Sequence, residues 1–506
     1  MGRISKRSKI LSVNTKKNSS LYRNTWLNLF GQGLPLVLAF LLLPVILKII
    51  GPERMGVLTT IWVVVGYFLL LDLGLGRAVI HFVAEQSGLD KDGDVAAYVW
   101  PALGIVGAAS ILGASSLSIA APYLVDLLLN VPENLRAETQ SAFVAIGLSL
   151  PFVTLTSCLR GVLEARHKFV GANVLQGFSS AVSVLIPLLI AFFAPNLAMI
   201  AWGLFAARAI LLAAHFLMAA REYPGLWARP RTTKLAYRRL LQFGTWSTVT
   251  NVVGPVMVYM DRLVVGSRID VALVPVYALP HEAVTRLLIF PSAVARALFP
   301  KMSSVATHEK LGLSKRVLSL STVAIFPVAL LLVYFSENAL ALWLGKDLGL
   351  KAAPILKVLG LGYFFNAICH VPFIRIQSLG RPDLTAKAHV VELPFYLVIL
   401  FALTNSFGAP GAAWAWLIRV FVDCFIMFWL AERLQKGEGF WREHWGVVLA
   451  AITLLPGLWL SDLSHRAVAA FLAAVIFGAL SWKYWLSKDL KAWLFTRFYP
   501  ISGKGA

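Results

Sequence analysis

Hydrophobic residues dominate this chain in long runs that are separated by short polar stretches. Crossing a hydrocarbon core of about 30 Å takes about 20 helical residues, because an α-helix rises about 1.5 Å per residue. About fourteen runs of that length occur, each ended by charges, proline or glycine clusters. They cover approximately residues 26–50, 56–84, 95–123, 140–160, 170–194, 197–220, 240–265, 272–299, 316–336, 352–375, 384–405, 408–431, 444–461 and 466–486. The pattern predicts an all-α integral membrane protein.

Composition supports a bilayer location. Of the 506 residues, 58% are hydrophobic and only 14% are charged, and the mean hydropathy is +0.74. A net charge of +21 is also found in proteins that bind nucleic acid. In membrane proteins, however, lysine and arginine collect in cytoplasmic loops beside anionic lipid, and the basic residues here lie between the apolar runs. Membrane lipids are therefore the expected surroundings, and no nucleic-acid partner is predicted.

Loop charge predicts the orientation of the spans. Connections such as 221–239 and 301–316 are rich in lysine and arginine, whereas alternate ones such as 51–55 and 194–197 are short and poor in them. Counting along the chain puts about thirty basic residues on one side of the membrane and about seven on the other. We therefore expect both termini in the cytoplasm.

An internal repeat divides the chain into related halves. A Thr-Trp pair recurs at residues 25–26 and 245–246, and Arg160 and Arg375 match after a small shift. Two parallel six-helix bundles related by a pseudo-twofold axis along the membrane normal would enclose a central cavity, as in alternating-access carriers rather than simple pores. The predicted parts are a basic cytoplasmic tail 1–23, an N-terminal bundle 24–220, a basic cytoplasmic linker 221–239, a C-terminal bundle 240–432, two extra transmembrane helices 433–487 and a cytoplasmic tail 488–506.

Several arginines fall inside the predicted spans. A charge at mid-bilayer costs about 2.5–3.5 kcal/mol, so each should face protein or water. Arg208 and Arg419 lie near mid-depth in the sixth and twelfth spans, one from each half. Such residues either form ion pairs that only fix helix packing, or together make a positive chamber for an anionic headgroup such as a lipid pyrophosphate. The candidate substrate-binding set is Arg77, Arg208, Arg286, Arg419 and His281.

Acidic residues in the spans are candidates for ion coupling or gating. Glu282 and Arg286 share a helix face at i, i+4, and Asp423 stands one turn beyond Arg419, where the two could pair. A buried carboxylate is suited to carrying a proton. Asp261 and Arg262, at the outer boundary, are either a gate pair or an interface anchor. The candidate set is Asp72, Glu282, Glu392, Asp423, Asp261 and Arg262.

Four arginines lie near the cytoplasmic boundary, among them Arg160 and Arg375. Their long side chains can reach water from there, or they can form a basic funnel that receives substrate. In the stretch 69–86, Arg77, His81 and Glu85 follow one another at i, i+4 and make a polar stripe near the same boundary, with Asp72 deeper in the span.

Metal and nucleotide chemistry have no sequence signature here. Cys158, Cys369 and Cys424 lie in apolar runs without C-x-x-C spacing or paired histidines, so neither a disulfide framework nor a metal site is predicted. No Walker-type G-x-x-x-x-G-K-[ST] occurs, and no outer loop is long enough for a catalytic constellation. We expect no cofactor and no enzymatic activity.

Four motifs carry a family resemblance that spans about residues 20–435. They are "GPERMGVLTTIWVVVGYFLLLDLGLGRAVIHFVAE" (51–85), "LRGVLEARHKFVGANVLQ" (159–176), "MDRLVVG" (260–266) and "ALFPKMSS" (297–304). The chain resembles the polysaccharide transporter branch of the multidrug/oligosaccharidyl-lipid/polysaccharide (MOP) exporter superfamily, which contains the O-antigen and exopolysaccharide flippases.

The resemblance implies a two-bundle fold with a V-shaped cavity and a function. A protein of this kind would move undecaprenyl-pyrophosphate-linked oligosaccharides across the bacterial inner membrane for surface polysaccharide biosynthesis. An ion gradient would drive it, and a polysaccharide polymerase and glycosyltransferases would act beside it. Two alternatives stay open: a drug or small-molecule antiporter of the same superfamily, and a polytopic membrane enzyme of glycan assembly.

Overall fold

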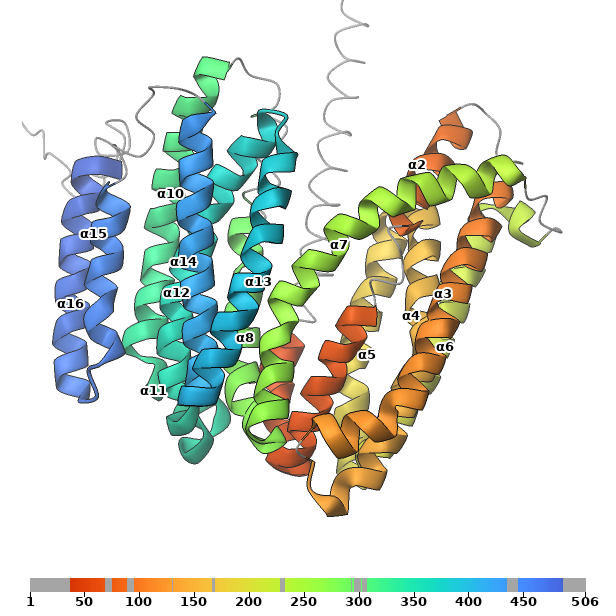
Figure 1. The fold of residues 1–506 in the computed structure, drawn as a ribbon, viewed down its shortest axis with the longest axis horizontal. Helices are drawn as coiled ribbons and strands as arrows, with labels where there is room; N and C mark the ends of the chain where they lie inside the picture. The colour runs from red at the N-terminus through yellow and green to blue at the C-terminus, as the bar shows by residue number, and fades with distance from the viewer. Residues whose placement is uncertain are drawn as a thin grey trace, which may run out of the picture. The chain divides into compact units, whose positions relative to one another are not determined.

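The computed structural model describes residues 37–68, 75–88, 95–129, 131–165, 169–227, 233–292, 294, 302, 307–434 and 445–485. Within these ranges every regular element is helical, as the apolar runs predict. Residues 37–68 are helical, and the longer helices that follow are α2 (Leu75–Gly88), α3 (Ala96–Tyr123), α4 (Glu133–Ala165), α5 (Phe169–Phe193), α6 (Leu197–Glu222), α7 (Lys234–Arg268), α8 (Val274–Leu287), α10 (Thr307–Tyr334), α11 (Ser336–Leu344), α12 (Lys346–Ser378), α13 (Pro382–Phe407), α14 (Ala409–Arg433), α15 (Trp445–Leu454) and α16 (Leu463–Leu480). Figure 1 shows them along the chain.

The described residues contain ten helices that are long and apolar enough to cross a membrane, and a shorter apolar helical segment Gly446–Leu458. These match predicted spans one by one. The remaining predicted spans, 26–50, 56–84 and 240–265, fall on the helical residues 37–68, on α2 and on α7, apart from the positions that lie outside the described residues. The all-α, multi-pass membrane class is confirmed. The predicted tails 1–23 and 488–506 lie outside the described residues.

Gly51 separates the first two predicted spans. Its φ of +81° lies in a region that L-residues with a side chain rarely adopt, so glycine is required here. A residue in that conformation interrupts right-handed helical geometry. The predicted connection at 51–55 therefore begins at the residue whose backbone departs from the right-handed helical conformation.

The chain forms two compact units, Met1–Ala272 and Leu273–Ala506. In the first unit α4 packs against both α3 and α6, and α2 packs against α4 (Figure 1). The α2–α4 contact is close, because a Cβ atom on Gly161 would lie 2.6 Å from the carbonyl oxygen of Gly76. Side chains such as Val79, Val99 and Leu159 form the apolar core there.

Glu138 joins three parts of the first unit at one end. Its carboxylate forms an ion pair with Arg54, with 2.9 Å between Arg54 Nε and Glu138 Oε1, and it also accepts a hydrogen bond from the backbone N–H of Leu197. The start of α4, the start of α6 and the segment after Gly51 thus meet at the same end. Our predicted orientation assigns all three to the same side of the membrane.

The second unit is built around α12. In an 18-residue apolar stretch of α12, 83% of the residues are buried, against 22% in the corresponding stretch of α13. Helix α12 is therefore the core helix, and α13 has a wide exposed apolar face. Helices α10, α11, α14 and α8 all pack on α12, and α13 packs mainly on α14 (Figure 1). The last helices, α15 and α16, pack against α10.

Helix α7 is grouped with the first unit because its contacts are with α2 and α3. It begins at Lys234, inside the segment 221–239 that the sequence marks as a basic linker. The division into a bundle 24–220 and a bundle 240–432 stays a prediction.

Candidate functional site

A cavity of about 380 Å³ with both polar and apolar walls lies in the first unit. Its walls come from the helical residues 37–68 and from α4, α5 and α6, each helix contributing one face. The wall positions on α4 and α5 follow the i, i+3, i+4, i+7 spacing of a single helix face. The lining residues are Trp62, Val65, Phe152, Val153, Thr156, Ser157, Arg160, Gln176, Ser179, Ser180, Val182, Ser183, Leu204, Arg208 and Leu211.

Arg208 lines this cavity from the middle of α6. It stands eleven residues after Leu197 (208 − 197), about 16 Å along the helix axis. One guanidinium nitrogen donates a hydrogen bond to the Ser149 hydroxyl over 2.5 Å, and Ser149 in turn donates to the Ile146 carbonyl at 2.7 Å. No carboxylate among the described residues pairs with Arg208, so its charge is available to the cavity.

Arg160 lines the same cavity from α4, near the end of that helix. Its Nε lies 2.6 Å from a Glu164 carboxylate oxygen, and its Nη1 donates to the Gln176 side-chain oxygen at 2.8 Å. The amide nitrogen of Gln176 reaches the Ser180 hydroxyl at 3.5 Å. Glu164 does not line the cavity but balances part of the Arg160 charge, so the walls present the unpaired charge of Arg208, a paired arginine, serine hydroxyls and an amide.

This combination suits a phosphate-like anion that carries polyol groups. Guanidinium groups bind phosphate oxygens with charge-assisted hydrogen bonds, and hydroxyl and amide groups bind sugar hydroxyls. A volume of about 380 Å³ lies in the range of small-molecule sites, about 300–1,000 Å³. The cavity therefore has the size of a headgroup rather than of a whole lipid-linked glycan.

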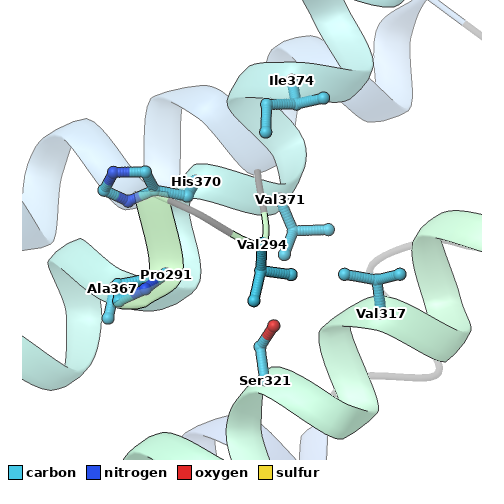
Figure 2. Close-up of a pocket in the computed structure, with 8 residues that line it drawn as sticks. All are labelled: Pro291, Val294, Val317, Ser321, Ala367, His370, Val371 and Ile374. Carbon is cyan, nitrogen blue, oxygen red and sulfur yellow. The ribbon is translucent and has the colours of Figure 1, made fainter. Parts of the chain in front are cut away.

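A second, much smaller cavity lies in the second unit between α10, α12 and residues 291–294 (Figure 2). Its volume is about 10 Å³, which is close to the minimum for one water molecule. In Figure 2 the Ser321 hydroxyl points toward Val294, among the side chains of Val317 and Val371. This cavity is too small and too apolar to bind a substrate.

The predicted residues of α8 lie together in the second unit. Arg286 and Glu282 form the predicted i, i+4 pair, with 2.9 Å between Arg286 Nη2 and Glu282 Oε1. His281 is fully buried, and its ring stacks on Tyr277 with centroids 5.5 Å apart and meets the edge of Trp416 at 5.4 Å. His281 is thus a packed core residue, and the Arg286 charge is neutralised on its own helix.

The predicted pairing of Arg419 with Asp423 is wrong. The Arg419 guanidinium lies over the Tyr396 ring, 5.5 Å from its centroid, and Asp423 is paired instead with His389, with 3.4 Å between His389 Nε2 and Asp423 Oδ1. The cause is helix packing: α13 lies against α14 and presents His389 to Asp423 from the neighbouring helix. Glu392 lies beside this pair and is 7% exposed.

The remaining predicted residues belong to the first unit. Asp261 is fully buried and accepts a hydrogen bond from the backbone N–H of Arg262 at 2.7 Å, and the Arg262 guanidinium lies over Tyr259, 5.5 Å from the ring centroid. Their burial, at 0% and 5% exposure, shows that these charges are enclosed by protein. Asp72 lies outside the described residues, and Arg77 stands on α2 with its side chain outside them.

Arg208 is therefore the predicted substrate residue that the structure places in the polar cavity, whereas Arg286 and Arg419 belong to the second unit. Of the boundary arginines, Arg160 joins Arg208 in the cavity. Arg375 does not reach water, because it is 0% exposed within α12. Sequence reasoning missed the polar stripe Gln176, Ser179, Ser180 and Ser183 on α5. Its i, i+3, i+4, i+7 spacing in an apolar span was the available signal.

The multi-pass helical fold and an arginine-lined cavity are those of a membrane transporter. Comparison with known proteins agrees. The model of the family described as "Polysaccharide biosynthesis protein" matches residues 21–306. A Shigella flexneri protein described as an O-antigen transporter is 31% identical over 419 residues, which cover 82% of this chain and 98% of the relative.

Two solved structures share the fold. The lipid II flippase MurJ in an inward closed conformation superposes with a TM-score of 0.67 at 13% identity, over 91% of this chain and 99% of MurJ. An inward-facing multidrug resistance transporter of the MATE family gives a TM-score of 0.64 at 13% identity, over 80% and 94% of the two chains. The chain belongs to the polysaccharide biosynthesis protein family, in the polysaccharide transporter branch of the MOP superfamily.

Proposed function

We propose that this protein is a flippase that moves undecaprenyl-pyrophosphate-linked oligosaccharides from the inner to the outer leaflet of a bacterial inner membrane by alternating access. The observation that carries the proposal is the cavity in the first unit with Arg160 and Arg208 in its walls and no lining acid. The description of the Shigella relative as an O-antigen transporter points to the same cargo.

Each part of the proposed substrate has a distinct place. The pyrophosphate binds the arginines of the cavity, while its first sugar is held by the serine and glutamine side chains of α5. The polyprenyl tail stays in lipid, since an apolar chain gains nothing from entering a polar site. Glycosyltransferases that build the lipid-linked unit and a polymerase that uses it are the expected partners.

The charge of the cavity argues against the drug antiporter. A cationic drug would meet the Arg208 guanidinium, which no carboxylate among the described residues pairs, and like charges repel. The likeness to the MATE transporter concerns the fold, and transporters of one fold handle different cargo.

A vesicle assay tests the proposal. Purified protein is reconstituted with an undecaprenyl-pyrophosphate oligosaccharide that carries a reducible fluorophore on its glycan, and a membrane-impermeant reductant is added outside. Empty vesicles should lose only the outer-leaflet fluorescence, and vesicles with the wild-type protein should lose nearly all of it. Arg160→Ala with Arg208→Ala should behave like empty vesicles.

Arg136→Ala is the matched control, since Arg136 lies on α4 like Arg160 but 43% of its side chain is exposed, far from the cavity walls. It should keep full activity. Export of a cationic dye by wild-type vesicles without any movement of the lipid-linked glycan would overturn the proposal, as would a new covalent glycan product.

A further inference from the structure

The second unit contains a cluster of metal-ligating side chains at the junction of α12, α13 and α14. The ligand atoms of His389, Glu392 and Asp423 all lie within 4.8 Å of one another. The Cys369 thiol approaches the same carboxylate from α12, with 3.5 Å between Cys369 Sγ and Asp423 Oδ2. Three donors thus converge from α13 and α14, and the Cys369 thiol contacts one of them from α12.

Helix geometry places these donors at one level. His389 and Glu392 stand at i, i+3 on α13 and therefore share a face. Glu392 lies ten residues after the start of α13 (392 − 382), and Asp423 ten residues before the end of α14 (433 − 423), which is about 15 Å along each helix. The cluster is therefore deep within both helices.

Glu392 is the unexplained member of the cluster. Its side chain is in the protein interior, 7% exposed, and neither carboxylate oxygen has a hydrogen-bond partner among the described residues. A buried carboxylate without hydrogen bonds is costly, because it has lost its water and gained nothing in return. One of its oxygens lies within 4.8 Å of the ligand atoms of His389 and Asp423, where a bound cation would contact all three.

We propose that His389, Glu392, Asp423 and Cys369 form a binding site for a zinc-class divalent cation. Nitrogen, sulfur and carboxylate oxygen are the ligands that Zn²⁺ prefers, whereas Na⁺, Mg²⁺ and Ca²⁺ prefer oxygen alone. Zn–N and Zn–O bonds of about 2.0 Å and a Zn–S bond of about 2.3 Å set tetrahedral edges of about 3.3 and 3.5 Å. The 3.4 Å between His389 Nε2 and Asp423 Oδ1 matches the first of these edges, and Cys369 Sγ lies 3.5 Å from the other carboxylate oxygen, Oδ2.

Charge counting supports a divalent ion. Arg419 is near enough to act electrostatically on Glu392, so the formal charge of the ionised cluster with neutral His389 and a protonated thiol is −1 − 1 + 1 = −1. A bound divalent cation offsets the charges of the two carboxylates, which is favourable at low dielectric.

The site also has an entry path. The side chain of His389 is 32% exposed and that of Asp423 is 16% exposed, so the metal can reach its ligands from one side. Once bound, the ion cross-links α12, α13 and α14, and it would hold them in one arrangement.

Metal binding to tag-free, purified full-length protein tests the site, with a readout that does not depend on transport. Calorimetry with Zn²⁺ should show stoichiometric binding, and Co²⁺ in its place should give the strong visible bands of a four-coordinate site with a thiolate charge-transfer band. His389→Ala should abolish stoichiometric binding, and Cys369→Ser should remove the charge-transfer band.

His465→Ala and Cys158→Ser are matched controls. His465 pairs with Asp462 at 3.2 Å in an exposed i, i+3 pair, and Cys158 is buried in the first unit, so both should keep full metal binding. Thermal unfolding with and without Zn²⁺ checks that each variant is folded. Co²⁺ bound without the thiolate band, Zn²⁺ displaced by an equal concentration of Na⁺, or unchanged binding in folded His389→Ala would each overturn the site.

Discussion

The guanidinium of Arg208 on α6 donates a hydrogen bond to the hydroxyl of Ser149 on α4, with 2.5 Å between Nη1 and Oγ. This bond orients the arginine without neutralising it, because a hydroxyl carries no charge. A half-buried cation that is held in place but not paired is ready to bind an anion.

We therefore expect a graded series of variants at this contact. Arg208→Ala removes a charge-assisted hydrogen bond of about 1.5–3 kcal/mol, so substrate affinity should fall by about 10- to 100-fold. Arg208→Lys keeps the charge but loses the planar guanidinium, so its substrate affinity should lie between those of the wild type and Arg208→Ala. Ser149→Ala keeps the guanidinium and should have the smallest effect. Apparent substrate affinity in the vesicle assay measures the series, and equal loss in all three would contradict it.

Glu164 should weaken anion binding at the second arginine. Its carboxylate lies 2.6 Å from Arg160 Nε and takes up part of the arginine charge. Glu164→Gln is expected to strengthen binding of a soluble pyrophosphate analogue, whereas Gln176→Leu should weaken it by removing a hydrogen bond that positions Arg160. Competition by the analogue in the flipping assay reports both. The idea fails if Glu164→Gln also weakens binding.

An enclosed ion-pair network fastens α16 and α12 to α11. Glu337 lies 2.8 Å from Arg466 and 3.0 Å from Lys357, whose side chains are only 4% and 8% exposed. Glu337→Gln would leave two buried cations without their anion, so we expect a loss of about 3–5 kcal/mol in the free energy of unfolding. The measurement is denaturant unfolding in detergent.

Glu133→Gln is the control for this network. Glu133 is 89% exposed and lies 4.0 Å from Arg136, so its loss should change stability by less than about 0.5 kcal/mol. Equal effects of the two substitutions would show that the Glu337 contacts do not stabilise the fold.

Gly411 sits where α13 and α14 turn back on each other. A Cβ atom there would collide with the backbone carbonyl of Leu403, so Gly411→Ala should cost about 1–3 kcal/mol through forced backbone movement. Gly478 on α16 has no neighbour within 4 Å of a built Cβ, and Gly478→Ala should leave the melting temperature unchanged or raise it. Thermal unfolding of both variants compares them directly, and a lower melting temperature for Gly478→Ala alone would reverse the argument.

The length of the hydrophobic runs predicted the spans well. In lipid, a long apolar segment forms an α-helix because the helix satisfies all its backbone hydrogen bonds internally. It missed α11, a nine-residue helix too short to cross a membrane, although it carries Glu337. Run length cannot detect such a helix, since α11 is stabilised by packing on α12.

The candidate site was harder to predict than the fold. The sequence predicted the depth of Arg208 in its span. It did not predict which residues line the cavity with Arg208, because Arg160 and the polar stripe of α5 lie near it only through helix packing. Arg375 lies near a predicted span boundary, from which its side chain was expected to reach water or line a funnel, but it is fully buried. His389 was not singled out because its partner Asp423 lies on another helix.

Glu138 holds three segments of the first unit together at one end. The segment after Gly51, the start of α4 and the start of α6 are all tied to this carboxylate, so these helices cannot spread there without breaking an ion pair and a backbone hydrogen bond. The opposite ends have no such tie to Glu138, and Arg160 lies toward that side of α4. If these helices separate, they should therefore separate at the end that holds Arg160 and not at the end that holds Glu138.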